Sequence, residues 1–220
     1  MSDKTTVPAI GRRERNKQQK LDRIVTAARA LFYAQGYKKT TTQQIAHAAQ
    51  VASGTLFLYA KTKEDLLLMV FHEEFIAIID AISVREDDPR PVDQQVSALF
   101  DTLFDYHAHD IELSRELMRV FSFVSDLERR EDVLEIHMAL ERKLRQTLEN
   151  AQAKGVLSEN VDALTIARAL FGAYNQSLMG WLGSYIDRDQ CNANLSSVIR
   201  GVLSLAYAKP EESEARRLAG

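Results

Sequence analysis

Residues 41–59, TTQQIAHAAQVASGTLFLY, predict two short helices separated by a tight break of three residues. Thr41 and Gln44 have the spacing of a capping box, in which a hydroxyl and an amide side chain close the first turn of a helix. Two helices of this length bury too little surface to be stable alone, so they need a longer helix to pack on. The residues expected to face that shared core are Ile45, Ala46, Ala49, Val51 and Leu56.

The segment before this pair supplies the longer helix. Apolar residues recur at intervals of three and four from about Arg15, and Gly36 lies where a glycine cap commonly ends a helix. In a three-helix unit of this kind, the N-terminal part of the last helix meets base edges in the DNA major groove. The sequence therefore predicts a helix-turn-helix over residues 15–65, preceded by a flexible basic arm over residues 1–14.

The charge distribution points to a polyanionic partner for the same region. The 220 residues carry a net charge of −3, but residues 1–63 hold twelve Lys and Arg against three acidic residues, a formal charge of +9. The remainder of the chain therefore carries −12. A basic end on an otherwise acidic protein is typical of nucleic-acid binding. Charge alone leaves a second interpretation open, a basic tail without a partner.

Residues 66–208 are expected to form a larger helical body, and residues 209–220 a polar tail. Pro89 and Pro91 mark a loop over residues 85–91. Helical patterns are expected over about 92–108, 111–125, 131–153, 161–185 and 188–208. Because no long stretch alternates with a period of two, the predicted fold is all-α, with a three-helix head and a larger body.

The sequence also bears on where the chain is expected to act. It has no run of 18 apolar residues, so no membrane span is predicted. The N-terminal basic residues are not followed by an apolar segment of the signal-peptide type. We therefore expect a cytoplasmic protein without a membrane partner.

Residues 23–67 resemble the TetR family of repressors. The matching positions are Arg23-Ile24, Ala27-Ala28, Leu31-Phe32, Gly36-Tyr37, Thr40-Thr41, Ile45-Ala46, Val51, Gly54-Thr55-Leu56, Tyr59, Lys63-Glu64 and Leu66-Leu67. The resemblance implies a homodimer that binds duplex DNA at a near-palindromic operator and is released by a small-molecule effector. The rest of the chain is similar to the family only in length and helical character.

The resemblance also implies which residues contact DNA, namely Thr42, Gln43, Ser53, Gly54, Thr55, Tyr59 and Lys63. Gln43 and Ser53 are the candidates for base contact, since Gln can bond adenine in two places and Ser is permissive. The other positions usually lie at the groove edge or hold phosphates. Two alternatives remain: core packing for Tyr59, and a solvated surface amide for Gln43.

Four positions depart from the usual pattern of the family, among them Ala60, which replaces an aromatic residue. Gln50 stands where a turn glycine is common, and a left-handed conformation there would cost on the order of 1 kcal/mol. Ala52 replaces the usual serine cap, which makes Ser53 the candidate cap of the second short helix. Phe57 replaces a tyrosine that commonly bonds a phosphate.

A small-molecule pocket is expected in the body. The middle helices are rich in aromatic and Met residues, with polar groups inside apolar faces, as is usual for such sites. The candidate ligand-binding residues are Phe100, Phe104, His107, Met118, Phe121, Tyr174 and Asn175. Each of them can also be an ordinary core residue, and it is the resemblance that favours a pocket for the set. Its composition favours a hydrophobic or aromatic effector.

The last two helical patterns are the candidates for a dimer interface. They combine apolar side chains with small residues, which allow helices to approach closely. The small residues are Gly172, Ala173, Gly180, Gly183 and Gly201, and the apolar ones are Phe171, Leu178, Trp181, Leu182, Val198, Val202 and Leu205. The resemblance implies a four-helix bundle made by two copies, and burial within one copy is the alternative.

No catalytic constellation is recognisable in the sequence. There is no Glu-x-x-His pair, no zinc-protease motif, no Gly-x-Ser-x-Gly elbow and no phosphate-binding glycine loop. Cys191 is the single cysteine, which excludes a disulfide framework and a thiolate metal cluster. We therefore predict no enzymatic activity, no metal and no cofactor. A non-specific architectural DNA-binding protein and a helical enzyme remain as alternatives.

Overall fold

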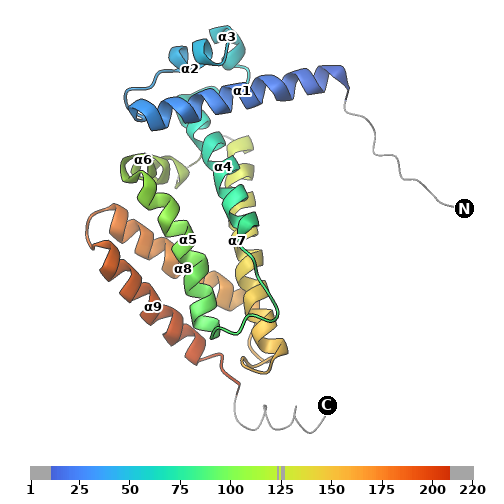
Figure 1. The fold of residues 1–220 in the computed structure, drawn as a ribbon, viewed down its shortest axis with the longest axis vertical. Helices are drawn as coiled ribbons and strands as arrows, with labels where there is room; N and C mark the ends of the chain where they lie inside the picture. The colour runs from blue at the N-terminus through green and yellow to red at the C-terminus, as the bar shows by residue number, and fades with distance from the viewer. Residues whose placement is uncertain (1–10, 123, 125–126, 209–220) are drawn as a thin grey trace, which may run out of the picture. The chain divides into compact units, whose positions relative to one another are not determined.

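The computed structural model describes residues 11–122, 124 and 127–208 and has helices without any strand in these ranges (Figure 1). The helices are α1 Arg12–Gln35, α2 Thr42–Ala48, α3 Ser53–Leu56, α4 Lys63–Ala81, α5 Val92–His109, α6 Ile111–Phe121, α7 Leu127–Ala153, α8 Ala163–Leu182 and α9 Arg188–Ser204. The all-α prediction is confirmed. No helix among the described residues has both the length and the apolar composition needed to cross a membrane.

The chain divides into two compact units, with the boundary between Phe71 and His72. We call residues 11–71 the head and residues 72–208 the body. The boundary lies inside α4, a few residues after the end of the predicted helix-turn-helix. One continuous helix therefore begins in the head and ends in the body.

The head is built on the apolar face of α1. Ile24, Ala28 and Phe32 are fully buried there, and they recur at four-residue intervals because such positions lie on one face of a helix. Gly36 ends α1 with φ 83°, a left-handed conformation that glycine adopts without strain. Among the predicted core residues of α2 and α3, Val51 is half-buried and the others are buried, namely Ile45, Ala46, Ala49 and Leu56.

The ends of several helices differ from the predicted ranges. Residues 12–14 belong to α1 and not to the predicted flexible arm, while residues 1–10 and the predicted tail, 209–220, lie outside the described residues. α6 ends at Phe121, and α7 begins four residues earlier than expected. α8 begins only at Ala163 because the carboxylate of Asp162 caps it by accepting from the N–H groups of Leu164 and Thr165.

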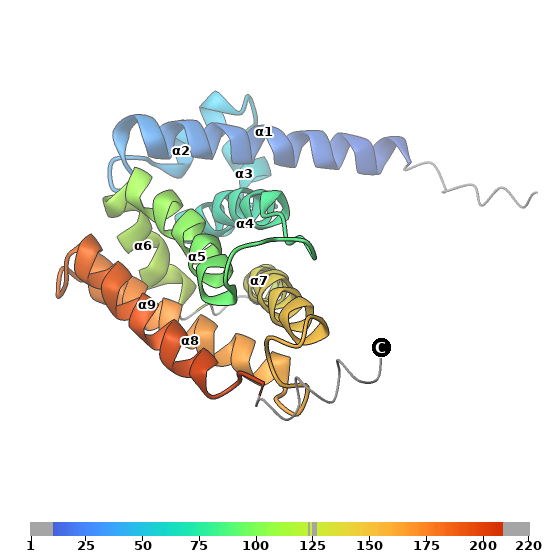
Figure 2. The same cartoon turned by 60° about the horizontal axis from the view of Figure 1, so that its bottom comes forward.

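In the body, α8 lies along α9 and packs on α7, while α5 contacts α7 and α9, and α6 contacts α5 and α8 (Figures 1 and 2). α9 ends at Ser204 because the chain then pairs with the segment after α7. There the Ser158 N–H donates to Ala206 O at 2.8 Å and the Ala208 N–H donates to Val156 O at 3.2 Å. These two hydrogen bonds join the segment after the C-terminal end of α7 to the segment after the C-terminal end of α9.

Candidate nucleic-acid interface and cavities of the body

α2 begins with the predicted capping box. The Gln44 N–H donates to Thr41 Oγ1 at 3.2 Å, and the Thr41 N–H donates to Gln44 Oε1 at 2.8 Å. Thr42 is half-buried and Gln43 is exposed in the first turn of the helix. The capping box thus fixes the start of α2 and leaves the Gln43 side chain on the outer surface of the head.

α3 is a single helical turn held by one apolar residue. Leu56 is fully buried, whereas Ser53 and Gly54 are exposed and Thr55 is half-buried. Leu58, which follows the helix, is 83% exposed. A short helix anchored from below in this way presents its N-terminal side chains to a partner, as a recognition helix does.

The break between α2 and α3 contains a strained turn. Gln50 adopts φ 54°, which is the left-handed conformation that the usual turn glycine would adopt without strain. The Val51 N–H then bonds Ala46 O at 3.0 Å. Non-glycine residues adopt this region at a cost of about 1 kcal/mol. The buried apolar contacts of α2 and α3 offset that cost and set the angle between the two helices.

Ser53 does not cap α3, so that prediction is wrong. The N-cap is Ala52, which has no side-chain oxygen, and Ser53 is the first helical residue. The side chain of Ser53 is therefore on the exposed outer surface. Phe57 is half exposed, and Tyr59 is half-buried, which leaves both core packing and surface contact open to its ring.

Lys63 has a structural role that the sequence did not reveal. Its ammonium donates to Tyr37 O at 2.9 Å and to Thr40 O at 3.1 Å, and lies 4.1 Å from the centroid of the Tyr37 ring. It thus joins the start of α4 to the turn between α1 and α2. Since an ammonium has three N–H bonds, one remains for a phosphate. No local pattern indicates this contact, because its partners are 26 and 23 positions away along the chain.

We predict that Lys63→Ala destabilises the head by about 1–2 kcal/mol, because Thr40 O and Tyr37 O lose the ammonium donor, although Tyr37 O still accepts from the Thr40 N–H. Urea unfolding followed by circular dichroism measures the loss. Lys61→Ala is the control, since it removes the same charge from an exposed neighbouring position. If Lys63 also holds a phosphate, its loss lowers the salt dependence of DNA binding by about one unit. Equal unfolding midpoints for the two variants would contradict the structural role.

In the body, four of the predicted ligand-binding residues pack on one another. Phe100, Phe104, His107 and Tyr174 are all almost completely buried. The ring of Tyr174 stacks on Phe100, with centroids 5.0 Å apart, and lies at the same distance from Phe104. Its hydroxyl has no hydrogen-bond partner among the described residues. These side chains form a closed aromatic core in the structure, with one buried polar group available for bonding.

His107 joins α5 to α6 inside this core. Its Nδ1 lies 3.1 Å from Ser114 Oγ, and the Ser114 hydroxyl is 3.2 Å from His107 O. Burial, together with the smaller effect of the Arg188 charge, lowers the pKa of His107 to about 3. The imidazole is therefore neutral at physiological pH.

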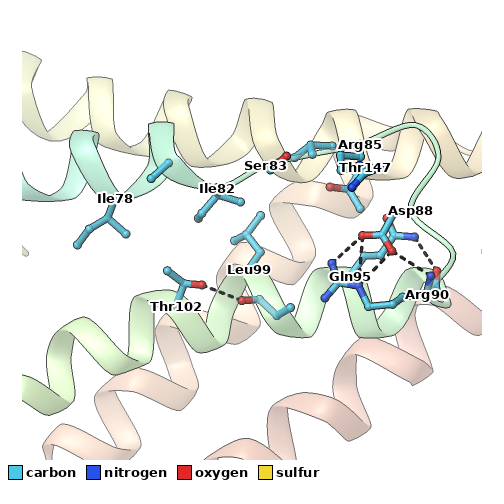
Figure 3. Close-up of a pocket in the computed structure, with 13 residues that line it drawn as sticks. Ile78, Ile82, Ser83, Arg85, Asp88, Arg90, Gln95, Leu99, Thr102 and Thr147 are labelled. Atoms are coloured by element: carbon cyan, nitrogen blue, oxygen red, sulfur yellow. Dashed lines mark hydrogen bonds and ion pairs between the residues drawn. The ribbon is translucent and has the colours of Figure 1, made fainter.

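A cavity of about 380 Å³ lies elsewhere in the body, between the end of α4, the 82–91 loop, α5 and α7 (Figure 3). Its apolar wall includes Ile78, Ile82 and Leu99, and Arg85 and Arg90 line it from the loop. We call it the α4-end cavity. None of the predicted ligand-binding residues lines it. The sequence missed this site because a loop and three helices from distant parts of the chain form its walls.

Lys143 of α7, Lys154 directly after that helix, and the loop itself hold the α4-end cavity in shape. Lys143 Nζ donates to Ile82 O at 2.7 Å, and Lys154 Nζ donates to Asp88 O at 3.3 Å. Asp88 pairs with Arg90 at 2.6 Å, and the hydrogen bonds from Arg90 lower the pKa of Asp88 to about 2. The two lysine hydrogen bonds and the Asp88–Arg90 ion pair therefore hold the 82–91 loop in place at the edge of the cavity.

A second hollow is an open groove of about 850 Å³ between α6, α8 and the α8–α9 turn. Met118 lines this groove. This predicted ligand-binding residue is therefore separate from the four that form the aromatic core. Phe121 and Asn175 are half-buried and line neither of these two hollows. Arg115 lies at the groove and donates to Leu182 O at 2.7 Å and to Ser184 Oγ at 2.8 Å.

The predicted interface residues of α8 and α9 fall into two groups. Leu178 and Leu182 are buried within the chain, so the expectation that they face a partner is wrong. A Cβ added to Gly183 would lie 2.7 Å from the Tyr185 ring. The α8–α9 turn within one copy therefore accounts for the glycine at this position. In contrast, a Cβ added to Gly172 or Gly201 would meet no atom of the described residues within 4 Å. Nothing among the described residues of one copy explains these two glycines.

Comparisons with known proteins agree with this arrangement. Residues 24–70 match the family described as bacterial regulatory proteins, tetR family. A fatty acid metabolism regulator protein of Bacillus subtilis is 25% identical over 76% of this chain and 86% of its own. The structure of Thermus thermophilus FadR with lauroyl-CoA has a TM-score of 0.67 at 25% identity and covers 83% of this chain and 92% of that one. That of Bacillus subtilis FadR with stearoyl-CoA has a TM-score of 0.59 at 25% identity and covers 84% and 96%.

Proposed function

Because the chain is a ligand-responsive DNA-binding regulator of the TetR family, we propose that it represses transcription as a homodimer on a near-palindromic operator, inside the cytoplasm. A small molecule with a long apolar part releases it. The observation that carries this proposal is the geometry of α2 and α3, in which a buried Leu56 supports an exposed N-terminal turn. A charge of +9 over residues 1–63 supports the same partner.

The proposed DNA contacts include three exposed positions of α2 and α3, which are Gln43, Ser53 and Gly54. In this proposal Gln43 and Ser53 form hydrogen bonds with base edges. The other predicted residues contact the phosphate backbone of the DNA, namely Thr42, Gly54, Thr55, Tyr59 and Lys63. Selection of bound sequences from random duplexes tests the proposal and should yield a palindrome. Equal affinity for the selected duplex and for random DNA would favour the architectural alternative and overturn it.

The proposed dimer forms through the exposed face of α8 and α9. Gly172 and Gly201 leave room there for a second backbone, and Leu205, four residues after Gly201, is 83% exposed. In an interface with two-fold symmetry each copy presents the same surface, so these positions meet their own counterparts. A four-helix bundle of this kind holds the two heads together for the two half-sites of the operator.

The proposed effector is a long-chain acyl thioester of coenzyme A, the class of molecule bound in the two FadR structures. The α4-end cavity is its proposed site, because an apolar wall suits an acyl chain, and because Arg85 and Arg90, which pair with Asp87 and Asp88 in this structure, lie where phosphates would replace those carboxylates. A volume of about 380 Å³ is within the usual range for small-molecule sites and suits the acyl chain, while the larger coenzyme A part would lie outside it. α4 runs from Lys63 in the head to Ile78 at this cavity, so a ligand that prefers one position of α4 shifts the head.

We predict that Ala98→Phe produces a regulator that binds its operator but does not respond to effector. Ala98 lines the α4-end cavity, so the added ring fills it and lowers affinity for lauroyl-CoA by about tenfold or more. Ala108→Phe, at an exposed position of the same helix, is the control. Calorimetry with lauroyl-CoA, stearoyl-CoA and free coenzyme A measures binding. A normal response in the Ala98→Phe variant would place the effector elsewhere.

A further inference from the structure

The first turns of α1 extend beyond the core of the head. All nine residues from Arg12 to Lys20 are exposed, and the first buried residue of the helix is Ile24. At 1.5 Å per residue these nine residues are about 13 Å long. Figures 1 and 2 both show this end of α1 extending past α2 and α3. We call residues 12–20 the basic segment.

The basic segment is cationic along its whole length. It contains one acidic residue, Glu14, and five basic ones, which are Arg12, Arg13, Arg15, Lys17 and Lys20. Its sequence, RRERNKQQK, has no apolar side chain, so it offers nothing to an apolar protein surface or to the interior of a lipid layer. The charge is carried by side chains on two successive turns and not by the N–H groups at the helix end.

These charges disfavour the helix in which they lie. Arg13 and Lys17 are four residues apart, and Arg12 and Arg15 are three apart, so like charges lie side by side. Cations in a first turn also oppose the helix dipole, and the N-cap, Gly11, makes no side-chain bond to the turn. Local support comes from an ion pair between Glu14 and Lys17, whose atoms are 3.8 Å apart, at exposed positions where screening is strong. A polyanion alongside would remove both penalties at once.

We propose that the basic segment binds the phosphate backbone of the operator beside the groove that α3 enters, and that this contact stabilises its helix. The inference rests on the proposed function, since it adds a second contact to the same DNA. The chemical match is charge complementarity between a row of cations and the regularly spaced phosphates of a duplex. The segment is continuous with the part of α1 on which the head is built, so phosphate contacts fix the orientation of the head without reading sequence.

The test is the salt dependence of operator binding by the full-length protein. Arg13→Gln with Lys17→Gln removes two charges at exposed positions and keeps good helix formers. We expect the slope of log K against log salt to fall by about two units per head, with an unchanged preference among operator sequences. Arg142→Gln with Arg145→Gln is the matched control, since it removes two exposed charges from α7 in the body. The control should keep the slope of the unmodified protein.

Hydrogen exchange of residues 12–20 is the second measurement. The amides of this segment should exchange several times more slowly when the selected operator duplex is added. Suppose that the unmodified protein binds its operator, that the variant with Arg13→Gln and Lys17→Gln has the same salt slope, and that the operator does not slow the exchange of residues 12–20. The basic segment then has no part in binding and this inference is wrong. If the unmodified protein binds no duplex at all, the proposed function itself fails, so the two failures are distinguishable.

Discussion

Gly172→Glu combined with Gly201→Glu is expected to give a folded monomer whose operator affinity is lower by about 100-fold or more, because a single head lacks the gain from two linked sites. Both positions are exposed and have space for a side chain within one copy. Their helices should therefore form normally, and replacement of helical glycine is itself favourable. In the dimer, however, each new carboxylate would meet its counterpart across a two-fold axis. The repulsion and the added volume both act on the association alone.

Sedimentation at micromolar concentration measures whether this variant is a dimer or a monomer, and circular dichroism measures whether it is folded. We expect unchanged helix content together with a shift from dimer to monomer. Ala77→Glu with Ala108→Glu adds the same two charges to exposed positions of α4 and α5 and should leave the dimer intact. A dimer that survives in the glycine variant would show that the chain associates through another surface.

The second large effect concerns pH and follows from His107. A histidine with an ordinary pKa of about 6.5 in the unfolded chain takes up a proton as the pH falls, whereas buried His107 stays neutral until about pH 3. Protons then favour the unfolded state, so stability is full above about pH 6.5 and is lost toward pH 3. Between pH 7 and pH 5 we expect His107 to lower the free energy of unfolding by about 2 kcal/mol.

Urea unfolding of His107→Gln at the two pH values measures this contribution. The variant has no imidazole to protonate, so its stability should change less between pH 7 and pH 5 than that of the unmodified protein, whatever its absolute stability. Burial also lowers the pKa of His137, so the double variant with His137→Gln should depend on pH least of all. The same pH dependence with and without His107 would mean that this imidazole is protonated in the folded protein.

The head could be read from sequence because its determinants are short-range. The capping box needs Thr41 and Gln44, three residues apart, and both bonds form as expected. Gln50 stands where a turn glycine is common in the family, and with φ 54° it adopts the left-handed conformation that such a glycine favours. Where a prediction failed, the failure was also local. Ser53 is the first residue of α3 and not its cap, because α3 begins directly after Ala52.

The body shows what pattern alone leaves open. Its aromatic residues fit a pocket and a core equally well in the sequence, and the structure packs Phe100 and Tyr174 on each other at 5.0 Å. The α4-end cavity is lined instead by residues that are scattered along the chain from Ile78 to Thr147. A cavity is the space that remains after packing, so no single segment encodes it.

The amino-acid sequence by itself determined the helices, the three-helix head and the opposite charges of the two ends, because periodicity, caps and charge act over a few residues. Tertiary structure alone decided that Lys63 joins α4 to the turn at Tyr37 and Thr40, that the 82–91 loop covers a cavity, and that Gly172 and Gly201 face open space. Those features depend on which distant segments meet. That outcome is set by the packing of all the helices together and not by any one of them.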